Sequence, residues 1–239
     1  MKRTVVAMFL VLASFFAFSQ QKSQPKTGAQ PQKKEAAVTM DNNTMKDTLA
    51  VFETDLGKIV IEFFPDKAPG HVKNFIELSQ SGFYSGTKFH RTVPGFMIQG
   101  GDPNTKAGDP SMWGTGGNVG PDGREKTLKA EFNDVHHARG VLSMARSSDP
   151  DSASSQFFVC VADAGFLDRK YTAFGKVIEG MDVADKIVSA PAGPKGPRDP
   201  EGSRPVKPVS IKKAYTIKRS EYKPVTESKP AAAPAAPVK

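Results

Sequence analysis

The sequence predicts a mainly β fold, an antiparallel barrel that closes its own edges and carries two helices. Short apolar runs of strand length, about eight or nine in number, recur between turn residues from residue 47 to residue 218. Only two stretches in this range have the apolar spacing of a helix. Many short strands at even spacing are typical of antiparallel barrels, whose closure removes exposed strand edges.

The domain opens with a predicted β-hairpin. Apolar side chains alternate along residues 49–52 and again along residues 58–63, with a turn that ends in Gly57 between them. Alternation of period two on both sides of a short glycine-containing turn indicates two paired antiparallel strands.

Two helices are predicted. Val72, Phe75 and Ile76 recur at the spacing of one helix face, which predicts a helix over residues 68–80. A second amphipathic stretch predicts a helix over residues 181–189. The remaining strands are expected at residues 88–93, 96–99, 127–131, 140–145, 156–162, 172–178 and 209–217.

Residues 1–19 have the pattern of a secretory signal peptide. Lys2 and Arg3 precede an apolar stretch without acidic residues, and small residues close it at the spacing that a signal peptidase accepts. We expect cleavage and export, with a periplasm favoured because the signal is short and cysteine pairs are absent. The alternative is an uncleaved segment that anchors the protein to a membrane.

The segments on either side of the domain are expected to be disordered. Residues 20–46 are rich in Gln, Lys and Pro, and residues 219–239 form a Pro/Ala/Lys tail. Neither segment holds enough large apolar side chains to offset the loss of chain entropy on folding. One domain of about 172 residues therefore remains, over residues 47–218.

The net charge of +8 lies almost wholly in these terminal segments. Residues 1–19, 20–46 and 219–239 carry +2, +3 and +2, which leaves +1 for residues 47–218. A nucleic-acid-binding surface is therefore not expected. The basic tails are instead expected to make weak contacts with an anionic membrane or wall polymer.

Several common kinds of active site are missing from the sequence. It holds neither a P-loop nor the G-x-S-x-G of serine hydrolases. His136 and His137 are adjacent and share no ligand spacing with other residues, so no metal site is expected. Cys160, the single cysteine, lies in an apolar run and is expected to be core. The glycine-rich residues 114–123 are expected to form a surface loop.

Four motifs stand apart from this background. They are FHRTVPGFMIQGGD at residues 89–102, GVLSMAR at 140–146, SQFF at 155–158 and FLD at 166–168. Together and in this order they resemble the cyclophilin-type peptidyl-prolyl cis/trans isomerases, and the resemblance spans residues 47–218. It implies a closed eight-stranded antiparallel β-barrel with a helix capping each end, and an enzyme that needs no cofactor.

The chemistry of prolyl isomerisation explains why an arginine such as Arg91 can be catalytic. An X-Pro bond exchanges slowly because amide resonance imposes a barrier of about 18–20 kcal/mol. A catalyst must favour the twisted state in which the prolyl nitrogen regains its lone pair. A guanidinium is always protonated and can donate a hydrogen bond to that lone pair, which the planar amide hardly accepts. The resemblance makes Arg91 this residue.

The resemblance also implies the binding site. Gln99 is expected to act with Arg91 and hold the substrate backbone, and Ala145 and Arg146 to bind peptide mainly through their main chain. The residues expected to line the proline site are Phe96, Met97, Phe158, Phe166, Leu167 and Tyr171. His90 is left out, because neighbouring strand residues point to opposite faces.

The sequence departs from the family pattern at three places. Phe166 stands where many members carry Trp, and Tyr171 where many carry His, so we do not expect tight binding of the immunosuppressant cyclosporin. Arg146 replaces a frequent Asn. The long stretch 104–127 contains the single tryptophan, Trp113. Two interpretations of this stretch stay open: it shapes the far side of the groove, or it is a loop without a role.

Two functions follow from these expectations. The favoured one is an exported prolyl isomerase, a monomer that accelerates folding of proline-containing polypeptides. The alternative is a non-catalytic proline-peptide-binding or chaperone module that uses the same groove for binding alone.

Overall fold

Eight antiparallel strands form one sheet in the computed structural model, which describes residues 40–196 and 199–224. The strand order is β3-β4-β6-β5-β7-β2-β1-β8. The strands are β1 (Thr48–Thr54), β2 (Gly57–Phe63), β3 (Arg91–Val93), β4 (Met97–Gly100), β5 (Val141–Met144), β6 (Phe157–Cys160), β7 (Ala173–Glu179) and β8 (Ile211–Lys218). The predicted signal peptide lies outside the described residues, as do most of the predicted spacer and tail.

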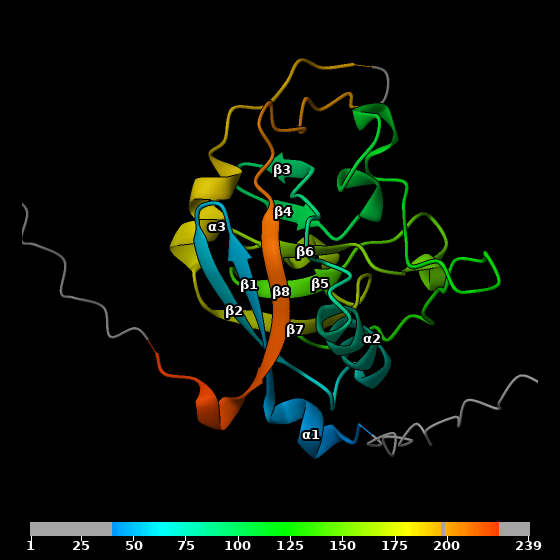
Figure 1. Cartoon of the computed structure of the whole chain (residues 1–239), viewed down its shortest axis with the longest axis vertical. Helices are drawn as coiled ribbons and strands as arrows, with labels where there is room; N and C mark the ends of the chain where they lie inside the picture. Colours follow the sequence, from blue (N-terminus) through cyan, green and yellow to red (C-terminus); the bar gives the residue numbers. More distant parts are fainter. Residues whose placement is uncertain (1–39, 197–198, 225–239) are drawn as a thin grey trace, which may run out of the picture. The chain divides into compact units, whose positions relative to one another are not determined.

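The sheet curls into a half-barrel, and the closed barrel that the sequence predicts is not formed. In Figure 1, β1, β2 and β8 cross the other strands at a steep angle, but β8 and β3 remain the two ends of the strand order. The chain before β3 runs past β8, where Phe89 N donates to Val209 O at 3.0 Å. Only one isolated bridge, Lys88 with Ser210, joins these segments among the described residues, because β3 begins too late to pair there.

Helices α2 (Pro69–Gln80) and α3 (Met181–Val188) agree with the two predicted ones. Helix α2 packs on β7 and β8, and α3 packs on β2, β3 and β4. Pro69 stands in the first turn of α2, where its missing N–H costs no hydrogen bond. Glu131 accepts from the amides of Gly70 and His71 at 2.9 Å, so it caps the helix. The strand predicted over residues 127–131 is absent: the amides of Ala130 and Glu131 donate to the side chains of Asp151 and Thr172, and within this range only Leu128 makes an isolated bridge.

Both predicted domain boundaries fall inside ordered structure. Helix α1 (Asn42–Lys46) occupies the end of the predicted spacer, and Asp41 caps it by accepting from Thr44 N at 2.7 Å. Met45 is buried against the core, which gives this short helix a place in the fold. Beyond β8, Tyr222 donates to Glu179 Oε2 at 2.9 Å, so the ordered chain continues past residue 218.

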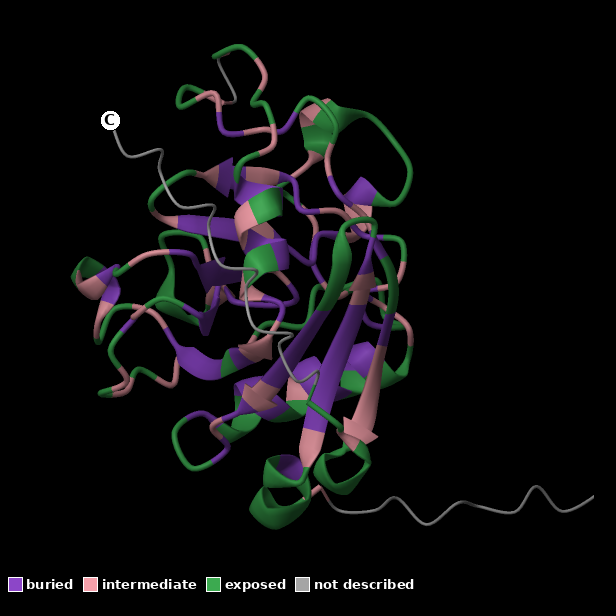
Figure 2. Cartoon of the chain, turned by 90° about the vertical axis from the view of Figure 1, so that its left-hand side faces the viewer, coloured by how far each residue is buried: buried purple, intermediate pink, exposed green. Residues whose placement is uncertain are grey.

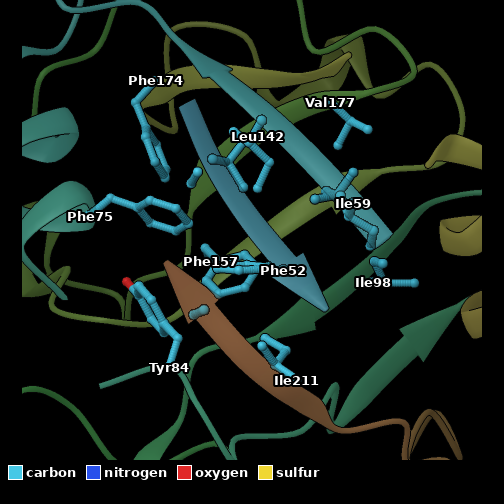
Figure 3. Packing of buried hydrophobic residues seen from close by; sticks show 14 of the residues in the cluster. Phe52, Ile59, Phe75, Tyr84, Ile98, Leu142, Phe157, Phe174, Val177 and Ile211 are labelled. Atoms are coloured by element: carbon cyan, nitrogen blue, oxygen red, sulfur yellow. The ribbon is translucent and has the colours of Figure 1, made fainter. Parts of the chain in front are cut away.

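The core fills the inside of the half-barrel and is rich in aromatic rings (Figure 3). Phe75 of α2 is fully buried, and its ring centroid lies 4.9 Å from that of Tyr84 and 5.2 Å from that of Phe174. Phe52 of β1 and Phe157 of β6 also pack on Phe75, and their own ring centroids lie 5.5 Å apart. Figure 2 shows burial concentrated on the strands, which leaves the connecting loops exposed to shape the surface.

Candidate active site

Three neighbouring strands place the predicted catalytic and binding side chains in one row. Arg91 of β3 lies opposite Gln99 of β4, and Gln99 lies opposite Phe158 of β6. Met97 is two residues from Gln99 and so shares its face of the sheet. The strand register therefore brings a guanidinium, a carboxamide and two apolar side chains to one surface.

One cavity of about 280 Å³, the proline cavity, contains every site residue that the sequence predicts. Its lining residues are Arg91, Phe96, Met97, Gln99, Ala145, Arg146, Phe158, Phe166, Leu167 and Tyr171. The structure thus brings them together, while their roles remain predictions.

The floor of the proline cavity is buried and its rim is open. Met97 and Phe158 are buried, whereas Phe166 is 62% exposed. The Phe96 ring bridges the two levels, since its centroid lies 5.2 Å from that of Phe166 and 6.5 Å from that of Phe158. Tyr171 meets Phe158 edge-on at 6.0 Å. The buried floor would exclude water from a bound apolar five-membered ring, and the open rim would let the ring enter from solvent.

The Arg91 guanidinium is one of two arginine groups that line the proline cavity, the other being that of Arg146. Arg91 Nη1 lies 3.4 Å from Gln99 Oε1 and 3.9 Å from Met97 Sδ. Its Nη2 donates to Glu201 Oε2 at 2.7 Å. Sequence reasoning did not include Glu201, which is 110 positions away in the chain and belongs to none of the motifs.

A line of polar groups extends from Arg91 along the groove. Gln99 Nε2 donates to Gln156 Oε1 at 3.0 Å, and Gln156 Nε2 donates to the Gly116 carbonyl at 2.9 Å. Glu201 and Gln99 thus hold Arg91 from two directions, which orients its remaining N–H groups.

Ala145 and Arg146 differ in part from expectation. The Ala145 amide donates to Gln156 O at 2.9 Å, so this main-chain group is already used within the sheet. The Arg146 guanidinium lies over the Tyr171 ring, 4.5 Å from its centroid, and donates to Lys170 O at 3.0 Å. Arg146 lines both the proline cavity and a neighbouring cavity of about 330 Å³ that contains Gln156.

A histidine–aspartate network supports the cavity from below. The His137 ring stacks on Phe158 with 17° between the planes, and its Nδ1 lies 2.9 Å from Asp168 Oδ1. Burial lowers the pKa of His137, and the Asp168 carboxylate opposes this. Exposed His136 contacts Asp168 at 2.7 Å and Asp163 at 2.5 Å, and these hydrogen bonds raise its pKa.

The same carboxylates flank the turn that carries two cavity residues. Phe166 and Leu167 lie in a short 3-10 helix, Gly165–Leu167, directly between Asp163 and Asp168. His136 bridges both ends of this turn, and its hydrogen bond is the main reason that the pKa of Asp168 is lowered. The turn that forms the rim is thereby held by the His136 side chain, which lies outside the cavity.

His90 does not line the proline cavity. It lines a neighbouring cavity together with Arg91, Gln99 and Trp113. His90 is 4% exposed. Burial lowers its pKa, against the opposing effect of the Asp102 carboxylate.

The described residues contain no group of three or more His, Cys, Asp or Glu side chains placed to hold a metal ion. Within residues 40–196 and 199–224 we also find no helix that is both long and apolar enough to cross a membrane.

Comparison with known proteins agrees with this fold and site. Residues 49–216 match the family model described as cyclophilin type peptidyl-prolyl cis-trans isomerase/CLD. A peptidyl-prolyl cis-trans isomerase of Acinetobacter baylyi is 41% identical over 175 residues, which are 71% of this chain and 87% of that protein. Peptidyl-prolyl cis-trans isomerase A of Dickeya dadantii is 40% identical over 181 residues, 72% of this chain and 86% of that one.

A solved structure is similar as well. The cyclophilin-type peptidyl-prolyl cis-trans isomerase of Cryptosporidium parvum, crystallised in the presence of the dipeptide Ala-Pro, matches with a TM-score of 0.60 and 31% identity. The match covers 71% of this chain and 99% of that one. The chain belongs to the cyclophilin-type peptidyl-prolyl cis-trans isomerase family. It is, like its curated relatives, an isomerase of X-Pro peptide bonds.

Proposed function

We propose that the proline cavity is the site of isomerisation and that its substrates are proline-containing segments of exported polypeptides. The observation that carries the proposal is the position of Arg91. Its guanidinium faces the same cavity as the apolar floor formed by Met97 and Phe158. When a proline ring lies on that floor, its nitrogen lies on the side of the cavity where the Arg91 guanidinium is.

The reaction needs no bond to form or break. As the peptide bond twists, resonance is lost and the prolyl nitrogen becomes pyramidal, with a localised lone pair. Arg91 donates an N–H to that lone pair, and this hydrogen bond exists only in the twisted state, so it lowers the barrier rather than the ground state. Gln99 and Glu201 keep the guanidinium oriented throughout, so little reorganisation is needed at the transition state.

The test compares Arg91→Ala with the wild type in exchange of a short Ala-Pro peptide from cis to trans. Loss of a preorganised donor is expected to lower kcat/KM about 100-fold or more. Arg124→Ala is the matched control, because Arg124 is exposed and lies outside the proline cavity. Equal rates for Arg91→Ala and the wild type would overturn the mechanism.

The non-catalytic alternative predicts a different pattern. If the groove acts by binding alone, Arg91→Ala keeps the cellular role, and blocking the pocket formed by Phe96 and Phe158 abolishes it. Complementation with the two kinds of variant separates the alternatives. The donor position of Arg91 favours the enzyme, since an apolar groove binds proline without a fixed cation.

We further propose that the protein acts outside the cytoplasm, in a periplasm. The support is the sequence pattern of residues 1–19, with two basic residues before an apolar stretch. Mass spectrometry of the protein from fractionated cells would identify its N-terminus. A start near residue 20 in the periplasmic fraction is expected, and a protein that retains residues 1–19 in the cytoplasm would contradict export.

A further inference from the structure

The proline cavity continues into two further cavities to which the proposed mechanism assigns no role. A connecting cavity of about 410 Å³ shares Arg91 and Gln99 with it. That connecting cavity shares Trp113 and Arg204 with a third cavity of about 620 Å³, which we call the Trp113 cavity. The connecting cavity therefore adjoins both the proline cavity and the Trp113 cavity.

The walls of the Trp113 cavity are mainly apolar. They come from two segments that lie side by side at the top of the molecule in Figure 1. The apolar lining residues are Pro110, Trp113, Pro194, Pro205, Val206 and Pro208. Val206 is 63% exposed, so one wall of the cavity presents a branched apolar side chain to solvent. Such a lining suits an aliphatic or aromatic side chain and not a charged one.

The charged side chains of this region already contact other groups of the protein, which argues against an ionic ligand. The Asp199 carboxylate accepts from the amides of Ser203 at 2.9 Å and Arg204 at 2.8 Å. The Arg204 guanidinium and the Lys88 ammonium lie over the Trp113 ring, 5.9 Å and 5.2 Å from its centroid. These cations hold the indole in place, so the apolar wall is a built feature of the fold.

Two residues in the cavity walls have buried nitrogen atoms without hydrogen-bond partners among the described residues. Neither ring nitrogen of His90 has a hydrogen-bond partner of ordinary geometry among the described residues, although His90 is 4% exposed and lines the connecting cavity. Trp113 Nε1 is buried and has no such partner either. Buried polar atoms without partners are costly, so a peptide backbone that passes through the groove gains hydrogen bonds that the free protein lacks.

We propose that the Trp113 cavity is a subsite for an apolar side chain of the polypeptide substrate. The inference rests on the proposed function, because the occupant is the chain that extends from a proline bound in the proline cavity. The connecting cavity adjoins both other cavities, so one extended segment can occupy all three. The enzyme therefore prefers prolines that have a large apolar residue a few positions away.

The test uses peptides that all contain one Ala-Pro bond. In each pair of peptides a single position, about two to five residues before or after the proline, carries either Leu or Ser. Burial of one leucine side chain contributes about 1.5 kcal/mol or more, which corresponds to roughly tenfold in kcat/KM. We expect this Leu-over-Ser preference at one position on one side. Val206→Glu should reduce it to about one, because a carboxylate would enter the apolar wall.

Val119→Glu is the matched control. Val119 is 58% exposed and lines none of the three cavities, so the same substitution there should leave the preference intact. Both valines are exposed, and neither change threatens folding. A wild type without preference at any position, or an equal loss in both variants, would overturn the subsite.

Tryptophan fluorescence separates this inference from the proposed function. Trp113 is the only tryptophan of the chain, so its emission reports on this cavity alone. In Arg91→Ala, where exchange is slow, the Leu peptide should still shift the emission and the Ser peptide should not. If the wild type does not accelerate exchange of the X-Pro bond but the Leu peptide still shifts the emission, the catalytic proposal is refuted and the subsite is supported. Normal exchange without the shift would refute the subsite and keep the catalytic proposal.

Discussion

The single thiol offers a direct test of the packing under the proline cavity. Cys160 lies opposite Met97 across β4 and β6, is fully buried, and belongs to the apolar cluster that contains Phe158. Burial raises its pKa to about 12. At pH 8 this leaves about one molecule in ten thousand as the thiolate, against roughly a quarter for an ordinary cysteine of pKa ~8.5. Because the thiolate is the nucleophile, we expect labelling to be slower by about 10³-fold.

The assay follows labelling with a thiol reagent at pH 8, in buffer and in concentrated urea. Every adduct reports on the same position, because the chain holds one cysteine. The control is an exposed thiol, Val119→Cys in a Cys160→Ser background, which should react in buffer at the rate of the unfolded chain. Labelling of native Cys160 within about tenfold of the unfolded rate would mean that the cavity floor opens to solvent and that the packing argument is wrong.

Three further predictions test the core, the arginine and the histidine bridge. Phe75→Ala should lower the free energy of unfolding by about 3–5 kcal/mol in urea denaturation, because a fully buried ring is removed from an aromatic cluster; a loss below about 1 kcal/mol would contradict the packing. Glu201→Gln should reduce kcat/KM about two- to fivefold with little change in stability, since an exposed ion pair contributes about 1 kcal/mol or less; an increase would show that Glu201 inhibits. Asp168 raises the pKa of His136 in the folded protein above its value near 6.5 in the unfolded chain. The stability that His136 contributes is therefore fully present below about pH 6.5 and is lost as the pH rises through the pKa of the folded state. The difference in urea midpoint between wild type and His136→Asn should therefore be larger at pH 6 than at pH 9, and an equal difference would refute the bridge.

The parts of the fold that the sequence predicts well are those with local causes. Helix α2 begins and ends within one residue of prediction, because its apolar spacing and Pro69 act within a few turns. The prediction of a strand at residues 127–131 is wrong because the amides of Ala130 and Glu131 donate to the side chains of Asp151 and Thr172, which are distant in the chain. Barrel closure fails for a similar reason, since it depends on whether two distant edges pair.

The functional site also contains parts with local causes, which the sequence predicts, and parts that depend on distant segments, which it does not. Arg91, Gln99 and Phe158 could be found from motifs, because each motif is a strand or turn whose geometry is set locally. Gly101 in the first motif has a positive φ of 84°, and a Cβ there would lie 2.5 Å from the Ser155 carbonyl, so this tight approach requires glycine. Glu201 has no such local signal, because its role exists only once a distant loop reaches Arg91.

The loop that carries Glu201 connects the general reaction to substrate choice. Residues 199–206 supply Glu201 to Arg91 and also Val206 to the Trp113 cavity. The first contact acts on the guanidinium and therefore affects every X-Pro bond, whatever surrounds it. The second can act only on substrates long enough to reach beyond Arg91. Glu201→Gln should therefore lower kcat/KM for short and long peptides alike, whereas Val206→Glu should lower it only for long ones, so the two effects of one loop can be separated by peptide length.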